Sequence, residues 1–336
     1  MNVQNDVLSR YAPGSSTYAD QDFDFETSAC EVFQYQSIQC AVFHEFLNAF
    51  GWPFDDPVSL QNIPFLPVEA FKYHEVMTSS WNPEGIFRSS GTQGGMRSRH
   101  LVRSLDGYRQ HTSHLFSAAF GALADFQVFA LLPNYLEAGD SSLVHMVRGF
   151  MQASGQKTQH FYLHDFESLH RSLQQCGQEG KRVLLFGVTF ALLDFATEFP
   201  MNLPADSIVI ETGGMKGRGQ ELSRSDLHRF LGTQFNLSHI FSEYGMTELM
   251  SQAYSDRNGH FFPPASMRVV IKEISDPMVE LPAGKVGVIH IIDLANVNTC
   301  SFIATADLGI KHDDGSFEVI GRLEQSDLRG CHLMYV

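Results

Sequence analysis

The stretch that decides the fold lies between residues 127 and 211. It contains four short apolar runs: Gln127-Val-Phe-Ala-Leu-Leu-Pro133, His160-Phe-Tyr-Leu-His164, Arg182-Val-Leu-Leu-Phe-Gly187 and Asp206-Ser-Ile-Val-Ile-Glu211. Helical periodicity fills the segments between them, at about 141–153, 166–177 and 189–198. Apolar runs separated by helices of this length are typical of a buried parallel sheet. We therefore predict an α/β core.

The segments on either side of this core have different patterns. Residues 1–80 are rich in aromatic and acidic residues, with an apolar helical stretch from Cys30 to Phe50 followed by prolines that break regular structure. Another helix is expected at 110–125. Beyond residue 265 the sequence predicts closely spaced antiparallel strands at 267–274, 285–293, 301–306 and 316–320. The predicted division is an N-terminal helical and loop segment (1–80), an α/β core (81–264) and a β-rich subdomain with a C-terminal tail (265–336).

Composition excludes several classes of function. The net charge of −15 over 336 residues argues against a nucleic-acid binder and disfavours docking on anionic lipid. Five scattered cysteines without a CxxC pair indicate reduced thiols, not a disulfide framework or a zinc site. The sequence shows no signal segment and no apolar run of ~18 residues, so a cytoplasmic protein without membrane insertion is expected.

The first candidate for chemistry is the loop Arg88-Ser-Ser-Gly-Thr-Gln-Gly-Gly95. Its backbone N–H groups and hydroxyls can converge on one anion, as phosphate-binding loops do. The GK[ST] ending of a Walker A loop is absent, and so is the GxGxxG pattern. A surface turn has the same composition, so the loop alone does not decide between the two.

The second candidate is Ser242-Glu-Tyr-Gly-Met-Thr-Glu248, directly after an apolar run. A strand end followed by Gly and a helical start is where α/β sheets place ligands. Tyr244 offers a flat face for a base, Thr247 a hydroxyl and Glu248 a carboxylate for a metal. The alternative is a strand-to-helix turn with a capping Thr and a solvated Glu.

The third candidate lies in the predicted antiparallel strands. Asp314-Gly315 between two apolar runs predicts a hairpin. Asp307 is expected at the end of the preceding strand, where its carboxylate can accept the two hydroxyls of a ribose or cap the turn.

In this order and spacing, the three segments resemble the acyl-adenylate-forming superfamily of acyl-CoA ligases, luciferases and adenylation domains, over roughly residues 80–331. The resemblance implies an N-terminal domain with parallel sheet layers and a β-rich subdomain, and the use of ATP and Mg²⁺. It implies that the Ser/Thr/Gly loop holds the ATP phosphates through Ser89, Ser90, Gly91, Thr92 and Gly94, with Thr92 also catalytic.

The same resemblance assigns roles to the later segments. Tyr244 and Gly245 would contact adenine, and Thr247 and Glu248 would help place Mg²⁺, with Glu248 both catalytic residue and metal ligand. Asp307 would bind ribose, and Arg322 matches the Arg of the family's Gly-Arg hinge. The Glu211-Thr-Gly-Gly-Met-Lys-Gly217 segment resembles the adenine-side loop, which makes Gly213 and Gly214 weaker candidates.

The C-terminal end departs from the larger superfamily. Typical members continue ~100 residues past the hinge into a mobile lid with a catalytic lysine, whereas this sequence stops at Val336, so a domain without that lid is expected. Gln325 stands where the hinge pattern tends to have an acid. The ending Gly321-Arg-Leu-Glu-Gln-Ser-Asp-Leu-Arg-Gly-Cys331-His-Leu-Met resembles the acyl-protein synthetase component of the bacterial luminescence fatty-acid reductase.

Members of that family form acyl-AMP and then move the acyl group to a cysteine near their own C-terminus. The resemblance carries this role to Cys331, where Arg329 and His332 would favour the thiolate. The alternative is that Cys331 is a small buried hydrophobe, as is expected of Cys300. Most histidines, His164 among them, are interpreted as surface or packing residues.

The sequence thus predicts ATP-dependent activation of a long-chain fatty acid to acyl-AMP, followed by transfer to an enzyme cysteine and on to an acyl-reductase or acyl-carrier protein. One alternative is a short ligase that transfers the acyl group directly to CoA or to a carrier-protein thiol. Another is a non-catalytic nucleotide-binding or scaffold protein. Acyl chain length, the final acceptor and the pathway stay open.

Overall fold

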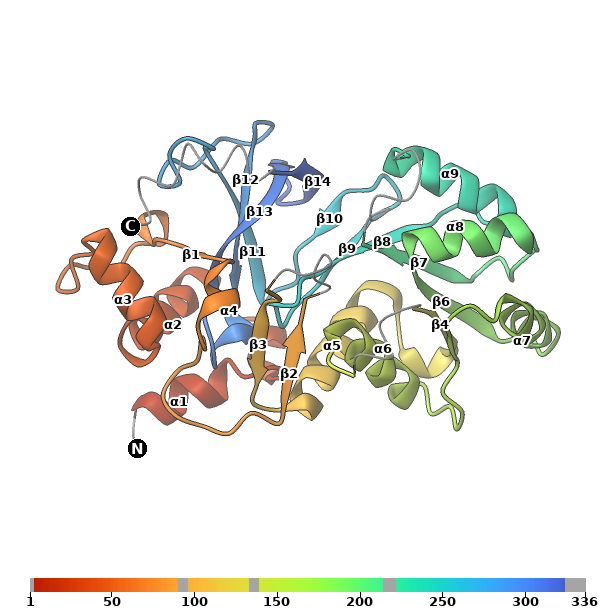
Figure 1. Cartoon of the computed structure of the whole chain (residues 1–336), viewed down its shortest axis with the longest axis horizontal. Coiled ribbons are helices and arrows are strands. Elements are labelled where there is room, and N and C mark those ends of the chain that lie inside the picture. The colour runs from red at the N-terminus through yellow and green to blue at the C-terminus, as the bar shows by residue number, and fades with distance from the viewer. Residues whose placement is uncertain (1–2, 90–95, 133–138, 214–221, 324–336) are drawn as a thin grey trace. The chain divides into compact units, whose positions relative to one another are not determined.

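The structure is a computed structural model that describes residues 3–89, 96–132, 139–213 and 222–323 (Figure 1). The chain forms two compact units. Unit 1 comprises Met1–Gly107, Met246–Ser251 and Phe262–Val336, and unit 2 comprises Tyr108–Gly245 and Gln252–Phe261. The division into three parts that the sequence predicts stays a prediction.

Unit 2 is built on the parallel sheet that the apolar runs predict. Its strands lie in the order β9–β8–β7–β6–β4–β5. Strands β4 to β8 pair in parallel, and β9 pairs antiparallel with β8. Their bounds are β4 Phe126–Leu131, β5 Phe161–Tyr162, β6 Arg182–Val188, β7 Ile208–Thr212, β8 Phe241–Tyr244 and β9 Ala253–Ser255. The predicted α/β fold class is confirmed.

Helices cover both faces of this sheet (Figure 1). On one face, α5 and α6 meet where the rings of Phe116 and Phe150 lie 5.1 Å apart. On the other, α7, α8 and α9 converge on Phe195, whose ring lies 5.7 Å from Phe166 and 6.1 Å from Phe235. The bounds are α5 Leu105–Phe120, η3 Leu123–Asp125, α6 Ser142–Ala153, α7 Phe166–Gln178, α8 Thr189–Glu198 and α9 Arg224–Phe235. Buried phenylalanines therefore form much of this core.

Unit 1 contains the antiparallel strands expected near the C-terminus. Strands β11–β12–β13–β14 pair in sequence order, and β1 pairs in parallel with β13. Strands β2 and β3 form a separate hairpin. The bounds are β1 Leu66–Pro67, β2 Gly85–Arg88, β3 Arg99–Val102, β11 Met267–Lys272, β12 Val286–Asp293, β13 Phe302–Lys311 and β14 Phe317–Arg322, with β10 Phe261–Phe262 where the chain passes from unit 2. The Asp314-Gly315 hairpin is confirmed: Gly315 has φ of 85°.

The helices of unit 1 lie mostly before residue 74. Their bounds are α1 Val3–Arg10, η1 Ser16–Ala19, α2 Phe25–Gln39, α3 Ala41–Phe50, η2 Leu60–Asn62, α4 Ala70–Tyr73 and η4 Leu294–Asn296. The helical stretch predicted from Cys30 to Phe50 is two helices, because Cys40 is extended and forms a β-bridge with Thr78. Phe33 and Phe43 from these helices pack on Phe302 of β13, at ring distances of 5.5 and 6.1 Å. Cys300 is fully buried, as expected of a core residue.

Two local expectations were wrong. Residues 247–248 form a turn and not the start of a helix, because the following N–H groups of Met250 and Ser251 bond to the Asp293 carboxylate. Asp307 lies within β13 and not at its end, since the strand continues to Lys311.

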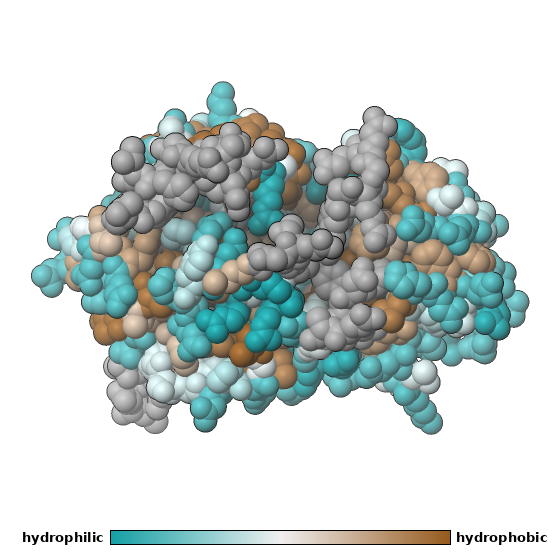
Figure 2. Space-filling model, in the orientation of Figure 1, coloured by the Kyte–Doolittle hydropathy of each residue, from teal (hydrophilic) through white to brown (hydrophobic). Residues whose placement is uncertain are grey.

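The surface of the described residues is largely polar on the face in Figure 2, where hydrophilic residues predominate between smaller hydrophobic areas. Among the residues that the structure describes, no helix combines the length and apolar character needed to cross a bilayer.

Candidate functional site

The base of the Ser/Thr/Gly loop is fixed by the β2–β3 hairpin of unit 1. Ser89 donates its N–H to the Ser98 carbonyl at 3.3 Å, and Ser98 returns its own N–H to Ser89 Oγ at 3.0 Å. The Arg97 guanidinium donates to the carbonyls of Arg88 and Ser89. Ser89 and Ser98, which are hydrogen-bonded to each other, therefore stand at the base of the loop. Four predicted phosphate-binding residues, Ser90, Gly91, Thr92 and Gly94, lie outside the described residues.

Ser98 connects this base to Glu248, the predicted metal ligand. The Glu248 side chain is buried, and burial raises the pKa of its carboxyl. A hydrogen bond from Ser98 and the nearby cations of Arg322 and Lys72 oppose that rise. Ser98 therefore holds the base of the loop through its backbone, and its side chain lowers the pKa of the Glu248 carboxyl.

His100 holds the segment that carries Thr247 and Glu248. Its Nδ1 lies 2.8 Å from the Thr247 carbonyl, and its Nε2 lies 3.2 Å from Thr299 Oγ1. Burial lowers the pKa of His100 to about 4, so the ring is neutral at neutral pH. Because a carbonyl only accepts, Nδ1 carries the proton and Nε2 accepts from the Thr299 hydroxyl.

The far side of the same segment is held by Asp293 and Asn296. Asp293 Oδ2 accepts the N–H groups of Met250 and Ser251 at 2.9 and 2.8 Å, and Oδ1 accepts the Ser251 hydroxyl at 2.7 Å. Asn296 donates to the Glu248 carbonyl at 2.8 Å. Burial raises the pKa of Asp293 to about 6 in spite of these hydrogen bonds. Hydrogen bonds to Asp293 and Asn296, and not a helix, therefore fix this turn.

Asp307 and Arg322 face each other across β13 and β14. They are register partners, and Arg322 Nε lies 3.6 Å from Asp307 Oδ1. The Asp307 side chain is 16% exposed and that of Arg322 is 69% exposed. Since Arg322 also acts on Glu248, unit 1 gathers Ser89, Glu248, Asp307 and Arg322 around one locality, which we call the unit 1 cluster.

Three further predicted residues, Gly213, Tyr244 and Gly245, lie in unit 2 at the carboxyl ends of β7 and β8. Gly213 follows β7 with φ of 73°, and its carbonyl accepts the Thr189 hydroxyl at 2.7 Å. Tyr244 ends β8, with its ring 5.9 Å from that of Phe261. A Cβ at Gly245 would overlap the Glu243 carboxylate. Gly214 lies outside the described residues, and so does Cys331.

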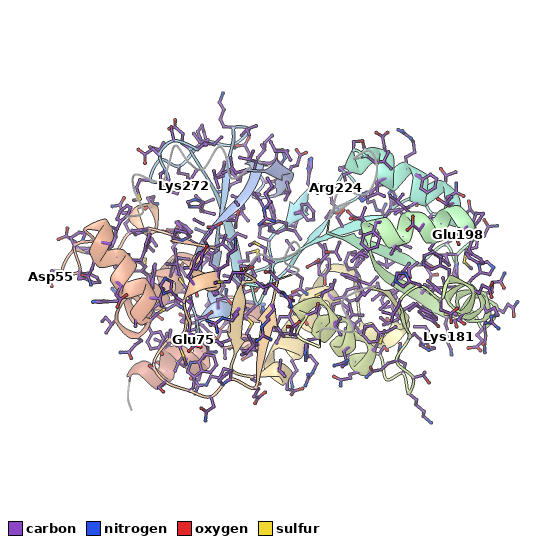
Figure 3. All side chains as sticks on the ribbon, in the orientation of Figure 1. Asp55, Glu75, Lys181, Glu198, Arg224 and Lys272 are labelled. Carbon is purple, nitrogen blue, oxygen red and sulfur yellow. The ribbon has the colours of Figure 1, made fainter. Side chains whose placement is uncertain are left out.

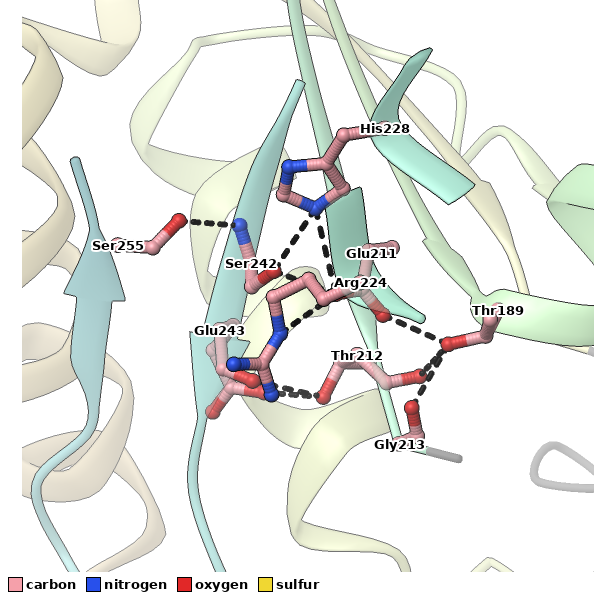
Figure 4. Close-up of polar contacts among 9 residues, drawn as sticks. All are labelled: Thr189, Glu211, Thr212, Gly213, Arg224, His228, Ser242, Glu243 and Ser255. Carbon is pink, nitrogen blue, oxygen red and sulfur yellow. Dashed lines mark hydrogen bonds and ion pairs between the residues drawn. The ribbon is translucent and has the colours of Figure 1, made fainter. Parts of the chain in front are cut away.

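Two buried carboxyls stand beside these strand ends (Figure 4). Glu211 accepts hydrogen bonds from Thr189 at 2.6 Å and from Ser242. Arg224, at the start of α9 (Figure 3), has its Nε 3.9 Å from Glu211 Oε1, and His228 Nε2 lies 3.6 Å from the same oxygen. Burial alone would raise the pKa of Glu211, but these partners together lower it.

The pKa of Glu243, on the neighbouring strand, is shifted in the opposite direction. Its register partner is Thr212, whose hydroxyl donates to the Glu243 carboxylate. Burial raises the pKa of Glu243 to about 7, and the charge of Glu211 adds to the rise. Unit 2 therefore holds one carboxyl that is ionised at neutral pH and one whose pKa lies close to neutral pH.

The family profile of the acyl-protein synthetases, LuxE, matches residues 31–335 of the sequence. The chain belongs to the LuxE acyl-protein synthetase family. The family resemblance seen in the three sequence motifs is thereby confirmed. No curated protein matches this LuxE family member.

Solved structures of adenylate-forming enzymes share the fold of this LuxE family member. An open conformation of 2-hydroxyisobutyryl-CoA ligase, in complex with 2-HIB-AMP and CoA, is 10% identical, with a TM-score of 0.65, over 89% of this chain and 70% of that one. ATP-bound MatB from Rhodopseudomonas palustris is 16% identical (TM-score 0.51), over 70% of this chain and 47% of that one. O-succinylbenzoate coenzyme A synthetase from Bacillus subtilis, in complex with AMP, is 15% identical (TM-score 0.51), over 70% and 49%. The LuxE chain thus spans about half the length of the latter two.

The unit 1 cluster of the LuxE chain fits a magnesium ion held together with phosphates. Mg²⁺ is usually bound by one or two carboxylates plus substrate phosphates, with oxygen ligands throughout. Glu248 offers a buried carboxylate with oxygen donors of the kind that Mg²⁺ takes. Glu248 is therefore the described residue that would hold the ion.

Sequence reasoning missed four residues that shape the cluster: Lys72, Ser98, His100 and Asp293. Ser98, His100 and Asp293 act through hydrogen bonds to residues outside their own elements, and Lys72 acts on the pKa of Glu248 through its charge. The spacing of Ser89, directly after β2, and Ser98, directly before β3, was the one available signal, since a hairpin would have brought them together.

Proposed function

We propose that this chain activates a long-chain fatty acid with ATP as the acyl-adenylate and then carries the acyl group on Cys331. The observation that supports this most is the unit 1 cluster, in which Ser98 holds the base of the Ser/Thr/Gly loop, Arg322 lies beside Asp307, and both Ser98 and Arg322 lower the pKa of the buried Glu248 carboxyl. An anion-binding loop, a buried carboxylate and a placed cation are the groups that phosphoryl chemistry requires.

In the first step, a carboxylate oxygen of the acid attacks the α-phosphorus of ATP. The new bond is O–P, and the bond from the α-phosphorus to the bridging oxygen breaks, so pyrophosphate leaves with the electron pair. Glu248 would hold Mg²⁺, which when bound neutralises phosphate charge. Ser89 and the loop residues Ser90, Gly91, Thr92 and Gly94 would bind phosphate oxygens, and Asp307 would accept the ribose hydroxyls.

The four unit 2 residues Tyr244, Gly245, Gly213 and Gly214 stay proposed contacts of the adenine, on the strength of the family resemblance. Thr247, whose carbonyl is held by His100, keeps its proposed part in placing the metal through its hydroxyl.

In the second step, the Cys331 thiolate attacks the acyl carbon of the adenylate. A C–S bond forms, the C–O bond to phosphate breaks and AMP leaves, while the thiol proton has been lost beforehand to solvent or a base. An acyl-reductase or an acyl-carrier protein would then receive the acyl group from the thioester.

Intact-protein mass spectrometry tests both steps. The wild type, Cys331→Ser and the control Cys30→Ser are incubated with ATP, Mg²⁺ and a panel of fatty acids, and released AMP is measured in parallel. We expect a hydroxylamine-sensitive acyl mass on the wild type and on Cys30→Ser, and none on Cys331→Ser. Cys30 is a suitable control because it is a partly exposed free thiol in unit 1.

The remaining outcomes separate the alternatives. AMP release without any acyl mass would favour direct transfer to CoA or to a carrier-protein thiol. Neither AMP nor an acyl mass with any acid of the panel would contradict acid activation and leave nucleotide binding without turnover.

A further inference from the structure

The Glu211 carboxylate lies near the end of β7 and contacts side chains from three other elements of unit 2 (Figure 4). Its Oε2 accepts the hydroxyl of Thr189, the first residue of α8, at 2.6 Å, and its Oε1 accepts the Ser242 hydroxyl from β8. From α9, His228 Nε2 and Arg224 Nε lie 3.6 and 3.9 Å from Oε1. One buried carboxylate therefore joins the ends of β7 and β8 to the first turns of α8 and α9.

Thr189 extends this network to Gly213, the residue that follows β7. Its Oγ1 lies 2.7 Å from the Gly213 carbonyl and 2.6 Å from Glu211 Oε2, so the two acceptors share its single proton. Gly213 has φ of 73°, a left-handed conformation that glycine adopts without strain. The Thr189 hydroxyl therefore fixes the peptide that leaves β7 relative to the carboxylate.

Ser242 extends the network along β8, two residues before Tyr244. Because its hydroxyl donates to Glu211, its oxygen can accept from His228 Nε2, which lies 3.0 Å away. The Ser242 N–H is donated to Ser255 Oγ of β9 at 2.8 Å. The backbone that carries Tyr244 is therefore held on both sides, by β7 through Glu211 and by β9 through Ser255.

Arg224 provides a second route to Tyr244. Its guanidinium carbon lies 4.9 Å from the centre of the Phe261 ring, a cation–π distance, and that ring lies 5.9 Å from the ring of Tyr244. The same arginine side chain is 33% exposed and has its Nε 3.9 Å from Glu211 Oε1. A chain of contacts therefore leads from the Glu211 carboxylate through Arg224 and Phe261 to the Tyr244 ring.

A carboxylate at the depth of Glu211 adds defined geometry more than packing energy. Burying a charge costs free energy unless it is paired and hydrogen-bonded, and an apolar side chain of similar volume is often as stabilising. Unlike an apolar group, a carboxylate fixes the positions of several donors at once, because its two oxygens accept hydrogen bonds from defined directions. The donors at Glu211 belong to the segments that lead to Gly213 and to Tyr244, so these two residues are fixed relative to each other.

We propose that Glu211 is a positioning residue of the nucleotide site, which aligns Gly213 and Tyr244 with the adenine of ATP. It acts through the hydroxyl of Thr189 and through the partners that it holds on β8 and α9. This inference rests on the proposed function, in which Gly213 and Tyr244 contact the adenine, and adds the residue that aligns them. Since Glu211 acts through these contacts and not on the reacting atoms, its loss weakens adenine binding and leaves the chemistry at saturating ATP intact.

The test compares Thr189→Val, Thr189→Ser and Glu211→Gln with the wild type. Thr197→Val and Glu198→Gln, at two exposed positions of α8, are the matched controls. Binding of ATP, adenosine and inorganic triphosphate is measured by calorimetry without any acid. Acid-dependent exchange of pyrophosphate into ATP then gives the KM for ATP and the rate at saturation, and thermal unfolding is recorded for each variant.

For Thr189→Val we expect the affinities for ATP and adenosine to fall together by about three- to tenfold, as loss of one hydrogen bond requires, with triphosphate affinity unchanged. The KM for ATP should rise by the same factor, while the exchange rate at saturating ATP stays near that of the wild type. Thr189→Ser keeps the hydroxyl and should restore both quantities. Glu211→Gln removes the charge and one acceptor, so it should show the same pattern with a loss of about tenfold or more. Both controls should behave as the wild type.

Wild-type affinity for ATP and adenosine in both Thr189→Val and Glu211→Gln would overturn the proposal and leave acid activation standing. A loss that Thr189→Ser shares, or one that includes triphosphate and comes with a lowered unfolding temperature, would also overturn it, because the network would then be structural only. If the wild type binds ATP but no acid supports exchange, acid activation fails, whereas a hydroxyl-dependent loss of adenosine affinity would still establish the positioning role. If the wild type binds neither ATP nor adenosine, both proposals fail.

Discussion

Two carboxyl groups in unit 2 differ in ionisation although they lie on neighbouring strands. Glu211 and Ser242 are register partners, as are Thr212 and Glu243, so the two glutamates point to opposite faces of the sheet. The face of Glu211 receives His228 and Arg224 from α9 and Thr189 from α8. For Glu243, a hydroxyl from Thr212 is the lowering influence on the pKa. The charge partners of a residue, more than its depth, therefore decide its protonation here.

At the residue scale we expect Glu243 to make stability depend on pH. Its pKa in the folded chain is about 7, raised from an ordinary 4.5, so the folded state binds more protons than the unfolded state between these values. The free energy of unfolding should then fall as pH rises from 4.5 towards 7, by up to about 3 kcal/mol. Urea unfolding of the wild type and Glu243→Gln at several pH values measures this difference.

The difference between wild type and Glu243→Gln should change across that window, since the amide does not titrate. Glu198→Gln is the control, because Glu198 is exposed at the end of α8 (Figure 3). A wild-type-to-Gln difference that stays constant with pH would show that Glu243 ionises normally in the folded chain.

Among the elements, the β13–β14 hairpin sets the spacing of Asp307 and Arg322. The register between the two strands shifts between Leu308 and Gly309, directly after Asp307. Gly309 has no room for a side chain: a Cβ there would overlap the Glu318 carbonyl and lie 2.6 Å from Ile289 Cδ1. Close backbone approach at this bulge therefore requires glycine.

Gly309→Ala should destabilise unit 1 by about 1–3 kcal/mol, the usual effect of overpacking a buried position. Gly321→Ala in the same hairpin is the matched control, because a Cβ there meets nothing within 4 Å. Chemical unfolding followed by circular dichroism compares the two. Equal unfolding midpoints for both variants would contradict this expectation. They would mean that β13 and β14 move apart to accommodate the added methyl group without a measurable loss of stability.

The elements that the sequence predicts well are those whose residues share one environment. Apolar runs such as 182–187 are buried along their whole length, so their composition alone reveals β6. The β2–β3 hairpin was missed because its strands have four residues each, too few for a periodic pattern. The break at Cys40 was missed for another reason: it depends on a β-bridge to Thr78, which local sequence does not encode.

The residues of the candidate site can also be divided into those that the sequence indicates and those that it does not. Ser89, Glu248 and Asp307 could be proposed from the sequence because motifs fix their order along the chain. Lys72 and His100 could not be proposed in this way. Lys72 is recognised only by the effect of its charge on Glu248, and His100 only by its hydrogen bond to Thr247. No pattern in a single sequence distinguishes such residues from an ordinary surface lysine or core histidine.

For the whole molecule, the two units differ in how their sequences are arranged. Unit 2 lies almost entirely within residues 108–261, whereas unit 1 needs segments from both ends of the chain. The contacts show the dependence: β1 pairs with β13, and Gln36 donates to the Asn296 carbonyl at 3.0 Å and receives the Ser301 N–H at 2.9 Å. An N-terminal fragment therefore lacks the partners of its own buried polar groups.

We accordingly expect a fragment of residues 108–261 to fold alone and a fragment of residues 1–107 to stay largely unfolded. The first retains strands β4 to β9 and the aromatic core around Phe116 and Phe195, while the second leaves Gln36 unpaired. Circular dichroism and thermal melting of the two purified fragments check this. A cooperative melt of 1–107, or none of 108–261, would contradict the expectation.

The segment Met246–Ser251 belongs to unit 1 although unit 2 precedes and follows it in the chain. During synthesis on the ribosome, Asp293 emerges some forty residues later, so the turn that carries Glu248 lacks its Asp293 hydrogen bonds while the parallel sheet can already assemble. A translating chain would therefore acquire Glu248 in its final position only after β12 has been made. A premature stop after β9 and before β12 would release a chain with a complete parallel sheet and no assembled unit 1 cluster.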